Sequence, residues 1–412
     1  MKSDMVPQIP GKVLVYDFNS SGHCPGWMHL AAMGFRQAGA EVLVACRLEA
    51  PEVRPWAERL ADGGCRVLGV AADGICHASH AAALARREGI GKVFFPNFDS
   101  VIYEMGKLGS TDALAGLDIG GIWLRPELTA QSRGTLRRMV EKMIRSRANK
   151  LRRKHERAVR NNRRGLAALL PPGRRITGVR LFFTSAPAAE QVGKLLPGET
   201  RKICDPWLAR GNFSRSDARS RLGVDDSRVV LLHLGTSRPE KGLKDACDAL
   251  LTLDDDIMNR LLLLRAGVVD RSDAPSLKRL EERGAARVID RYLSEEELSL
   301  CYAACDRVLL PYRNQSETSG VLIHAAAHGK PVIASDYGWI GSVVRIHGLG
   351  WLFRQGDGVA LAALMAKAAG STGGSDAAGM ERFAADNSPE TFQHTLVEQW
   401  LREPTHPDAV DE

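Results

Sequence analysis

Short apolar runs alternate with longer amphipathic stretches along the whole chain. In the first half these runs favour buried strands, at residues 12–18, 41–46, 65–70, 92–95, 121–124 and 179–184. Helices are predicted between them, over 25–39 and 80–88. Nearly continuous apolar runs of this length are typical of parallel strands that are covered on both faces. The pattern therefore predicts a parallel sheet flanked by helices.

The same alternation starts again in the second half of the chain. Strands are predicted here at residues 229–234, 260–266, 287–290, 306–311 and 331–335. Ser214 and Gly223 bracket a polar helical stretch, and both are typical capping residues. Ser294 is followed by three glutamates, and acidic residues in a first turn favour a helix start.

The two alternating sets divide the chain. With 412 residues it is long enough for two or three domains. We predict an α/β protein with two Rossmann-like, doubly wound parallel-sheet domains, at residues 1–196 and 205–385.

The composition is that of an ordinary globular protein, with 44% apolar and 25% charged residues. No run of about 18 apolar residues predicts a membrane span, and the first residues lack the apolar stretch of a signal peptide. The eight cysteines form no C-x-x-C pair, which favours buried, reduced thiols over a zinc site. We therefore expect a cytoplasmic protein.

Positive charge is concentrated in residues 133–175, although the net charge is only +7. This segment has sixteen Lys or Arg and two acidic residues, and it is helical by propensity as far as Pro171. Three interpretations stay open: a solvated helical insertion, a contact with an anionic membrane, or phosphate-only binding of nucleic acid. The segment has no aromatic residue on which bases could stack, which argues against recognition of single-stranded nucleic acid but leaves phosphate-only binding open.

A first candidate for ligand binding is the loop and helix start that precede the strand at 331–335. Helix starts carry a partial positive charge and free N–H groups, which attract phosphate. The residues predicted to bind here are Ser316, Glu317, Thr318, Ser319, Gly320 and Val321.

A second segment supplies cations. The apolar run at 229–234 is followed by Gly235 and Thr236, and then by Arg238 and Lys241 at a helix start. An arginine fork can bind two phosphate oxygens, and lysine adds a point charge. Together the two segments suit a diphosphate, such as that of a sugar nucleotide.

These segments resemble a known family. The matching positions are Gly235, Arg238, Lys241 and Gly242, residues 319–323 and 329–335, Gly338, and a proline-containing link at 204–207. Over about 205–353 the chain resembles the large "glycosyl transferases group 1" type of retaining GT-B glycosyltransferases, which assemble bacterial polysaccharide and lipopolysaccharide.

The resemblance implies a fold, a reaction and a different substrate for each domain. Residues 1–196 would bind a sugar or lipid-linked acceptor, and 205–385 the nucleotide-sugar donor, across a cleft. Residues 386–412 would form a helix that returns to the first domain, followed by a tail. The reaction would retain anomeric configuration and need no metal or other cofactor, with Arg238 and Lys241 stabilising the leaving diphosphate. The spacing Asp254-Asp255-Asp256 is better explained by a helix cap.

One departure concerns two glutamates that the family usually carries, with seven residues between them. In register, Ser316 and His324 occupy these places, and Glu317 lies one residue from the first. The resemblance places His324 at the donor ribose, where an imidazole can still hydrogen-bond a hydroxyl.

In the first domain the candidate site residues come directly after predicted strands. Ser21, Gly22 and His23 lie in the first loop. Ser21 and Gly22 are predicted to bind the donor, since Gly22 lets the backbone approach the donor diphosphate or the acceptor. His23 is a candidate catalytic acid or base. Asp99 is the candidate carboxylate for the acceptor hydroxyl. Two alternatives to the transferase stay open: a sugar-nucleotide epimerase of the same fold, and a non-catalytic protein that binds nucleotide sugars or nucleic acid.

Overall fold

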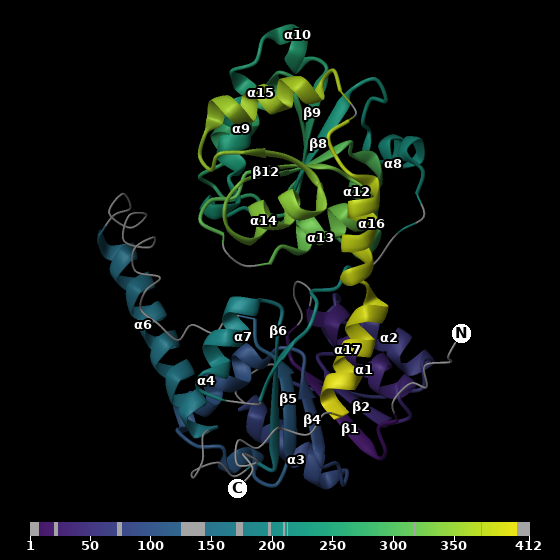
Figure 1. Ribbon diagram of the computed structural model, residues 1–412, viewed down its shortest axis with the longest axis vertical. Coiled ribbons are helices and arrows are strands. Elements are labelled where there is room, and N and C mark those ends of the chain that lie inside the picture. Colours follow the sequence, from purple (N-terminus) through teal and green to yellow (C-terminus); the bar gives the residue numbers. More distant parts are fainter. Residues whose placement is uncertain are drawn as a thin grey trace, which may run out of the picture. The chain divides into compact units, whose positions relative to one another are not determined.

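The computed structural model describes residues 8–19, 24–71, 76–124, 145–169, 176–196, 199–208, 211, 213–315, 318–371 and 373–401. The chain divides into two compact units (Figure 1). One comprises Met1–Cys204 and Pro389–Glu412, and the other comprises Asp205–Ser388.

The first unit is built on a seven-stranded parallel sheet with the strand order β3-β2-β1-β4-β5-β6-β7. Its strands are β1 (Lys12–Asp17), β2 (Glu41–Cys46), β3 (Arg66–Gly69), β4 (Lys92–Phe95), β5 (Asp118–Ile122), β6 (Gly178–Phe183) and β7 (Thr200–Lys202). Its helices are α1 (Cys24–Gln37), α2 (Arg54–Asp62), α3 (His77–Arg87), α4 (Phe98–Leu108), α6 (Arg145–Ala168), α7 (Ala186–Gly193) and α17 (Pro389–Leu401).

Helix α17 belongs to this first unit although it lies at the other end of the sequence. It runs beside α1 (Figure 1), and the Trp400 side chain is only 2% exposed. Trp400 packs against Phe35 and Phe94, with ring centroids 5.2 and 5.8 Å apart. Gly120 makes room for it, since a Cβ there would lie 2.2 Å from the indole ring.

Helix α6 is the described part of the basic segment, and it confirms the helix predicted there. It packs closely on α4, because a Cβ on Gly106 would lie 1.9 Å from the Asn161 carbonyl oxygen. In the part of α6 whose side chains are described, Val159 and Leu166 are buried and several arginines are exposed. Residues 133–144 and 170–175 lie outside the described residues.

The second unit has a six-stranded parallel sheet with the order β10-β9-β8-β11-β12-β13. Its strands are β8 (Val229–Leu234), β9 (Leu261–Ala266), β10 (Ala286–Ile289), β11 (Arg307–Leu310), β12 (Val332–Ser335) and β13 (Gly350–Phe353). Its helices are α8 (Arg215–Leu222), α9 (Leu243–Leu251), α10 (Asp255–Met258), α11 (Ala274–Glu282), α12 (Glu295–Ala304), α13 (Gly320–Ala327), α14 (Gly338–His347), α15 (Gly358–Ala368) and α16 (Ala377–Asp386).

The helix ends of this unit follow the capping chemistry of the sequence. The Ser214 hydroxyl accepts a hydrogen bond from the Asp217 amide (3.1 Å), and Gly223 ends α8 with φ +64°. Ser294 and Glu297 form a complete capping box at the start of α12. Asp254 stands at the N-cap position of α10, in agreement with the predicted cap.

Two parallel sheets with helices confirm the predicted α/β, Rossmann-like fold class. All eight cysteines are free thiols, and most of them are buried. No described helix combines the length and the apolar character needed to cross a bilayer. Within the described ranges, no group of three or more His, Cys, Asp or Glu side chains could hold a metal ion.

Candidate donor site

The loops that follow β8 and β11 lie side by side, because these two strands are neighbours in the sheet. The Arg313 amide donates to the Glu240 carbonyl oxygen at 2.8 Å. Gly242 has φ +65°, and a Cβ there would lie 2.0 Å from the Pro311 carbonyl oxygen. A side chain at position 242 would therefore force the two loops apart.

The two predicted phosphate-binding cations lie on one turn of the β8–α9 loop. The Lys241 amide donates to the Arg238 carbonyl oxygen at 2.8 Å. The Lys241 ammonium lies over the Tyr312 ring, 3.8 Å from its centroid. The Arg238 side chain is 47% exposed, and its Nε lies 3.5 Å from the Glu240 carboxylate. Exposed ion pairs of this kind are weak, so Arg238 can exchange Glu240 for a phosphate.

The loop after β11 leads into the start of α13, the second predicted part of the site. Ser319 stands at the N-cap position but makes no capping hydrogen bond. Its side chain is buried, at 3% exposed, and its Oγ has no hydrogen-bond partner in the described structure. Apart from the neighbouring residues and the helix's own backbone, no atom of the described residues lies within 4 Å of a Cβ built on Gly320, so they leave space beside the helix start. The helix start thus offers free N–H groups and an unused hydroxyl to a ligand.

Val321 is half-buried, and its carbonyl oxygen accepts a hydrogen bond from the Tyr302 hydroxyl at 3.2 Å. Ser316 and Glu317, which were also predicted to bind the donor, lie outside the described residues.

An acidic side chain that the sequence analysis used only as a link marker also lies at this helix start. The carboxyl group of Asp205 hydrogen-bonds the side chain of Thr318. Burial raises the pKa of Asp205 to about 7, and the bond to Thr318 opposes that rise. Its only sequence signal is a place just before Pro206 in the link.

His324 lies one turn into α13, within a stack of aromatic rings. Its ring centroid is 5.8 Å from that of Tyr302 and 6.3 Å from that of His328. Burial, and secondly the charge of His328, lower the pKa of His324 to about 3. The imidazole is therefore neutral at physiological pH, with one donor and one acceptor nitrogen.

In the first unit, Asp99 lies in the first turn of α4, and its Oδ2 accepts a hydrogen bond from the Leu124 amide at 3.0 Å. Ser21, Gly22 and His23 lie outside the described residues.

A second carboxyl group in this unit, that of Asp17, stands at the end of β1. It is 2% exposed, burial raises its pKa to about 7, and its Oδ2 has no partner in the described structure. Asp17 is not among the site residues predicted from the sequence.

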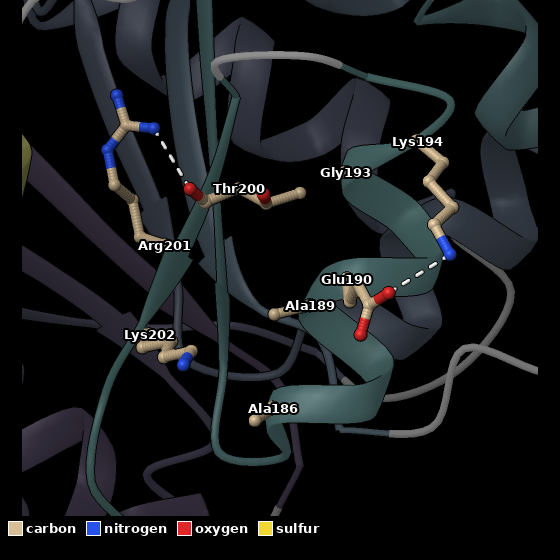
Figure 2. Close-up of a pocket in the computed structure, with 8 residues that line it drawn as sticks. All are labelled: Ala186, Ala189, Glu190, Gly193, Lys194, Thr200, Arg201 and Lys202. Carbon is tan, nitrogen blue, oxygen red and sulfur yellow. Dashed lines mark hydrogen bonds and ion pairs between the residues drawn. The ribbon is translucent and has the colours of Figure 1, made fainter.

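A hollow of about 520 Å³ lies between α7 and the edge strand β7 (Figure 2). It is lined by Ala186, Ala189, Glu190, Gly193, Lys194, Thr200, Arg201 and Lys202. Figure 2 shows the Lys194 ammonium paired with the Glu190 carboxylate, at 3.0 Å. No predicted site residue lines this hollow.

The paired loops and the helix start belong to a segment that matches a known family. Residues 228–370 match the family model described as Glycosyl transferases group 1. Residues 228–370 of the second unit are therefore similar to the glycosyl transferases group 1 family, and the predicted resemblance is confirmed over this stretch. The group 1 segment includes Arg238, Lys241 and all of α13.

Curated relatives are similar over part of their length. A GDP-mannose:glycolipid 4-beta-D-mannosyltransferase of Xanthomonas campestris pv. campestris is 31% identical over 128 residues, which is 30% of this chain and 35% of the relative. A D-inositol 3-phosphate glycosyltransferase of Geodermatophilus obscurus is 30% identical over 180 residues, or 40% of each chain. The matches thus span well under half of either relative.

Solved structures are similar over almost the whole chain. HepE of Anabaena, in complex with UDP-glucose, has a TM-score of 0.64 at 15% identity and covers 94% of this chain and 98% of its own. WaaG, a glycosyltransferase involved in lipopolysaccharide biosynthesis, has a TM-score of 0.62 at 16% identity, with coverage of 94% and 98%. These similarities confirm the predicted GT-B fold.

Proposed function

We propose that the protein transfers a sugar from a nucleotide diphosphate to a hydroxyl acceptor. The Lys241 ammonium lies over the ring of Tyr312, and Tyr312 belongs to the loop between β11 and the open start of α13. This contact is the observation that carries the proposal. We infer that the two cations and the helix start bind the same ligand. A diphosphate suits both, because its oxygens can pair with the cations and accept hydrogen bonds from the helix-start N–H groups.

Sugar transfer requires that the departing diphosphate be stabilised as its negative charge develops. Arg238 and Lys241 supply positive charge, and the Ser319–Val321 turn supplies N–H groups. We propose that these groups allow the transfer to proceed without a metal. We also propose that the reaction retains configuration, with the acceptor attacking from the face that the diphosphate leaves, so that the leaving phosphate can take the proton of the acceptor hydroxyl.

The nature of donor and acceptor is proposed from the relatives. HepE was crystallised with UDP and with UDP-glucose, and the Xanthomonas relative is named for GDP-mannose and a glycolipid. We infer a nucleotide-sugar donor for the second unit. We infer a sugar or lipid-linked acceptor for the first unit, in polysaccharide or glycolipid synthesis. Asp99 would handle the acceptor hydroxyl, His23 would act as an acid or base, and Ser21 and Gly22 would bind the donor.

The test is a screen of nucleotide sugars by thermal shift, followed by a turnover assay. A donor that binds only the folded state raises the melting temperature. Nucleotide release that requires an added acceptor supports the transferase, whereas an altered sugar nucleotide without acceptor indicates an epimerase. Binding without turnover would indicate a non-catalytic protein, the alternative suggested by Ser316 and His324 in the glutamate positions.

Replacing His324 with alanine is expected to weaken donor binding about fivefold, the scale of one neutral hydrogen bond. The pKa of about 3 keeps the imidazole neutral, so this loss should be equal at pH 6 and pH 8. Calorimetric titration with the donor measures it. His328→Ala, in the same stack, is the matched control. An unchanged affinity in His324→Ala would leave His324 as a packing residue.

The exposed face of α6 suits an anionic membrane, which would place the protein on the inner face of the cell membrane. Arg157, Arg160 and Arg164 are exposed, while the opposite face packs on α4. Each cation near such a surface contributes about 1 kcal/mol. Changing Arg157 and Arg160 to Gln should therefore weaken sedimentation with phosphatidylglycerol vesicles about thirtyfold. Equal binding of both forms, or preferential binding to short RNA, would contradict this interpretation.

A further inference from the structure

We propose that His233 and Arg265 are positioning residues of the donor site. They hold two carbonyl groups of the β8–α9 loop from the interior, and so direct Lys241 and the Thr236 amide towards the diphosphate. This inference rests on the proposed function and extends it to residues that touch no substrate.

The two side chains lie beneath the loop, inside the sheet. His233 on β8 and Arg265 on β9 are partners in register, so they occupy the same face of neighbouring parallel strands. They are buried, at 1% and 0% exposed. Each stands one residue before the carboxyl end of its strand, and the β8–α9 loop follows the end of β8.

The imidazole of His233 hydrogen-bonds the backbone of Lys241. Its Nε2 lies 3.0 Å from the Lys241 carbonyl oxygen. A carbonyl only accepts, so Nε2 carries the hydrogen. Burial, followed by the charge of Arg265, lowers the pKa of His233 to about 3, and the ring is neutral. Nδ1 is then a buried acceptor, and it has no partner in the described structure.

The stability of the fold does not by itself explain a buried histidine at position 233. A buried acceptor without a hydrogen-bond partner costs free energy, and an apolar ring would avoid that cost. We therefore infer that the hydrogen bond from the imidazole to the Lys241 carbonyl oxygen, which holds the loop in place, is the reason for a histidine at position 233.

Arg265 is a buried cation that binds backbone carbonyl groups. Its guanidinium donates to the carbonyl oxygens of His233 (3.2 Å), Gly235 (2.6 Å), Val268 (2.9 Å) and Ala266. It forms no ion pair within the described part of the chain. Burial lowers its pKa to about 10, with the charges of Asp273 and Asp290 opposing the shift, so it stays protonated at neutral pH.

The bond from Arg265 to Gly235 decides where the next amide points. A trans peptide unit is planar, with its C=O and N–H directed oppositely. Because the Gly235 oxygen points inward to the guanidinium, the Thr236 N–H points outward. Gly235 has φ +101°, which suits this orientation, and Thr236 is exposed. The loop that carries Lys241 then also presents an outward-pointing amide, above a buried positive charge.

The first test is a double-mutant cycle between His233 and Lys241, with UDP and GDP as calorimetric probes. His233→Phe keeps a buried ring of similar size but removes the bond to the Lys241 carbonyl. It should weaken binding of whichever probe binds about tenfold, the scale of a displaced charged group. In a Lys241→Ala background the same change should have no effect, because the group that it positions is gone. Equal losses in both backgrounds would overturn the proposal.

The matched control is His347→Phe. His347 lies in the same unit, on α14, with its ring centroid 5.0 Å from that of Phe383. This variant should bind the probes as the wild type does. A loss as large as that of His233→Phe would mean that any histidine-to-phenylalanine change in the unit weakens binding, and would also overturn the proposal.

A second readout needs no ligand. Reductive methylation with ¹³C labels lysine side chains and keeps their charge, and the Tyr312 ring should displace the methyl resonance of Lys241 upfield. Lys241→Arg identifies the resonance. In His233→Phe it should move towards the exposed lysines, and an unmoved resonance contradicts the proposal. If the wild type binds neither nucleotide, the proposed function fails, while this resonance still decides the role of His233.

Discussion

Replacing Lys241 with alanine is expected to lower the rate of sugar transfer about a hundredfold or more, and Arg238→Ala should do the same. This is the usual scale for removing one charged or hydrogen-bonding group that stabilises a transition state. Both side chains lie on the turn that contacts the loop between β11 and α13, and we expect the negative charge of the departing diphosphate to develop there. The loss should fall mainly on kcat, because that charge is largest in the transition state.

Steady-state kinetics with the donor found in the screen measure this prediction. Lys244→Ala is the matched control, since Lys244 lies three residues further on, is 61% exposed, and pairs with Asp248. Its removal should leave kcat and KM unchanged. Wild-type rates in both Lys241→Ala and Arg238→Ala would show that neither cation stabilises the leaving group, and would refute the diphosphate site.

The parallel strands could be predicted from the sequence where both faces are buried. The run at Val229–Leu234 and the run at Glu41–Cys46 are strands with the predicted bounds. Two strands at sheet edges were missed. Thr200–Lys202 is short and polar, and Gly350–Phe353 begins with a glycine whose Cβ would lie 2.1 Å from the Val332 carbonyl oxygen. Edge strands lack the apolar run that marks a central strand.

The residues of the candidate site likewise fall into two groups, those that the local sequence indicates and those that it does not. Arg238, Lys241 and the start of α13 could be predicted because their chemistry depends on short spacings within one loop. The contact of Asp205 with Thr318 joins residues that are far apart in the sequence, and nothing local indicates it. His233 lies inside an apolar strand, where a sequence pattern gives no partner for its imidazole.

Asp99 shows a further limit of such reasoning. Its place after a strand end suggests an acceptor-side carboxylate, but its hydrogen bond to the Leu124 amide depends on how β5 ends beside α4. Asp17, whose buried Oδ2 is without a partner in the described structure, has no local signal because it completes an ordinary apolar strand. The burial that raises the pKa of Asp17 and the hydrogen bond that Asp99 accepts are both tertiary properties.

Replacing Trp400 with alanine is expected to destabilise the first unit by about 3–5 kcal/mol, the usual cost of truncating a buried aromatic residue. Its ring fills the space over Gly120 and contacts Phe35 and Phe94, so the change leaves a cavity where α17 meets the sheet. Urea unfolding followed by circular dichroism should show a lower midpoint for one transition.

The matched control for Trp400 is Leu108→Ala. Leu108 is also a large apolar residue of the first unit but is 53% exposed, so its loss should cost no more than about 0.5 kcal/mol. Limited proteolysis gives an independent measurement, since a loosened α17 should be cut faster in Trp400→Ala than in Leu108→Ala. If both variants unfold and resist protease as the wild type does, α17 contributes no stability to the first unit. The C-terminal helix is then an attachment to this unit rather than part of its core.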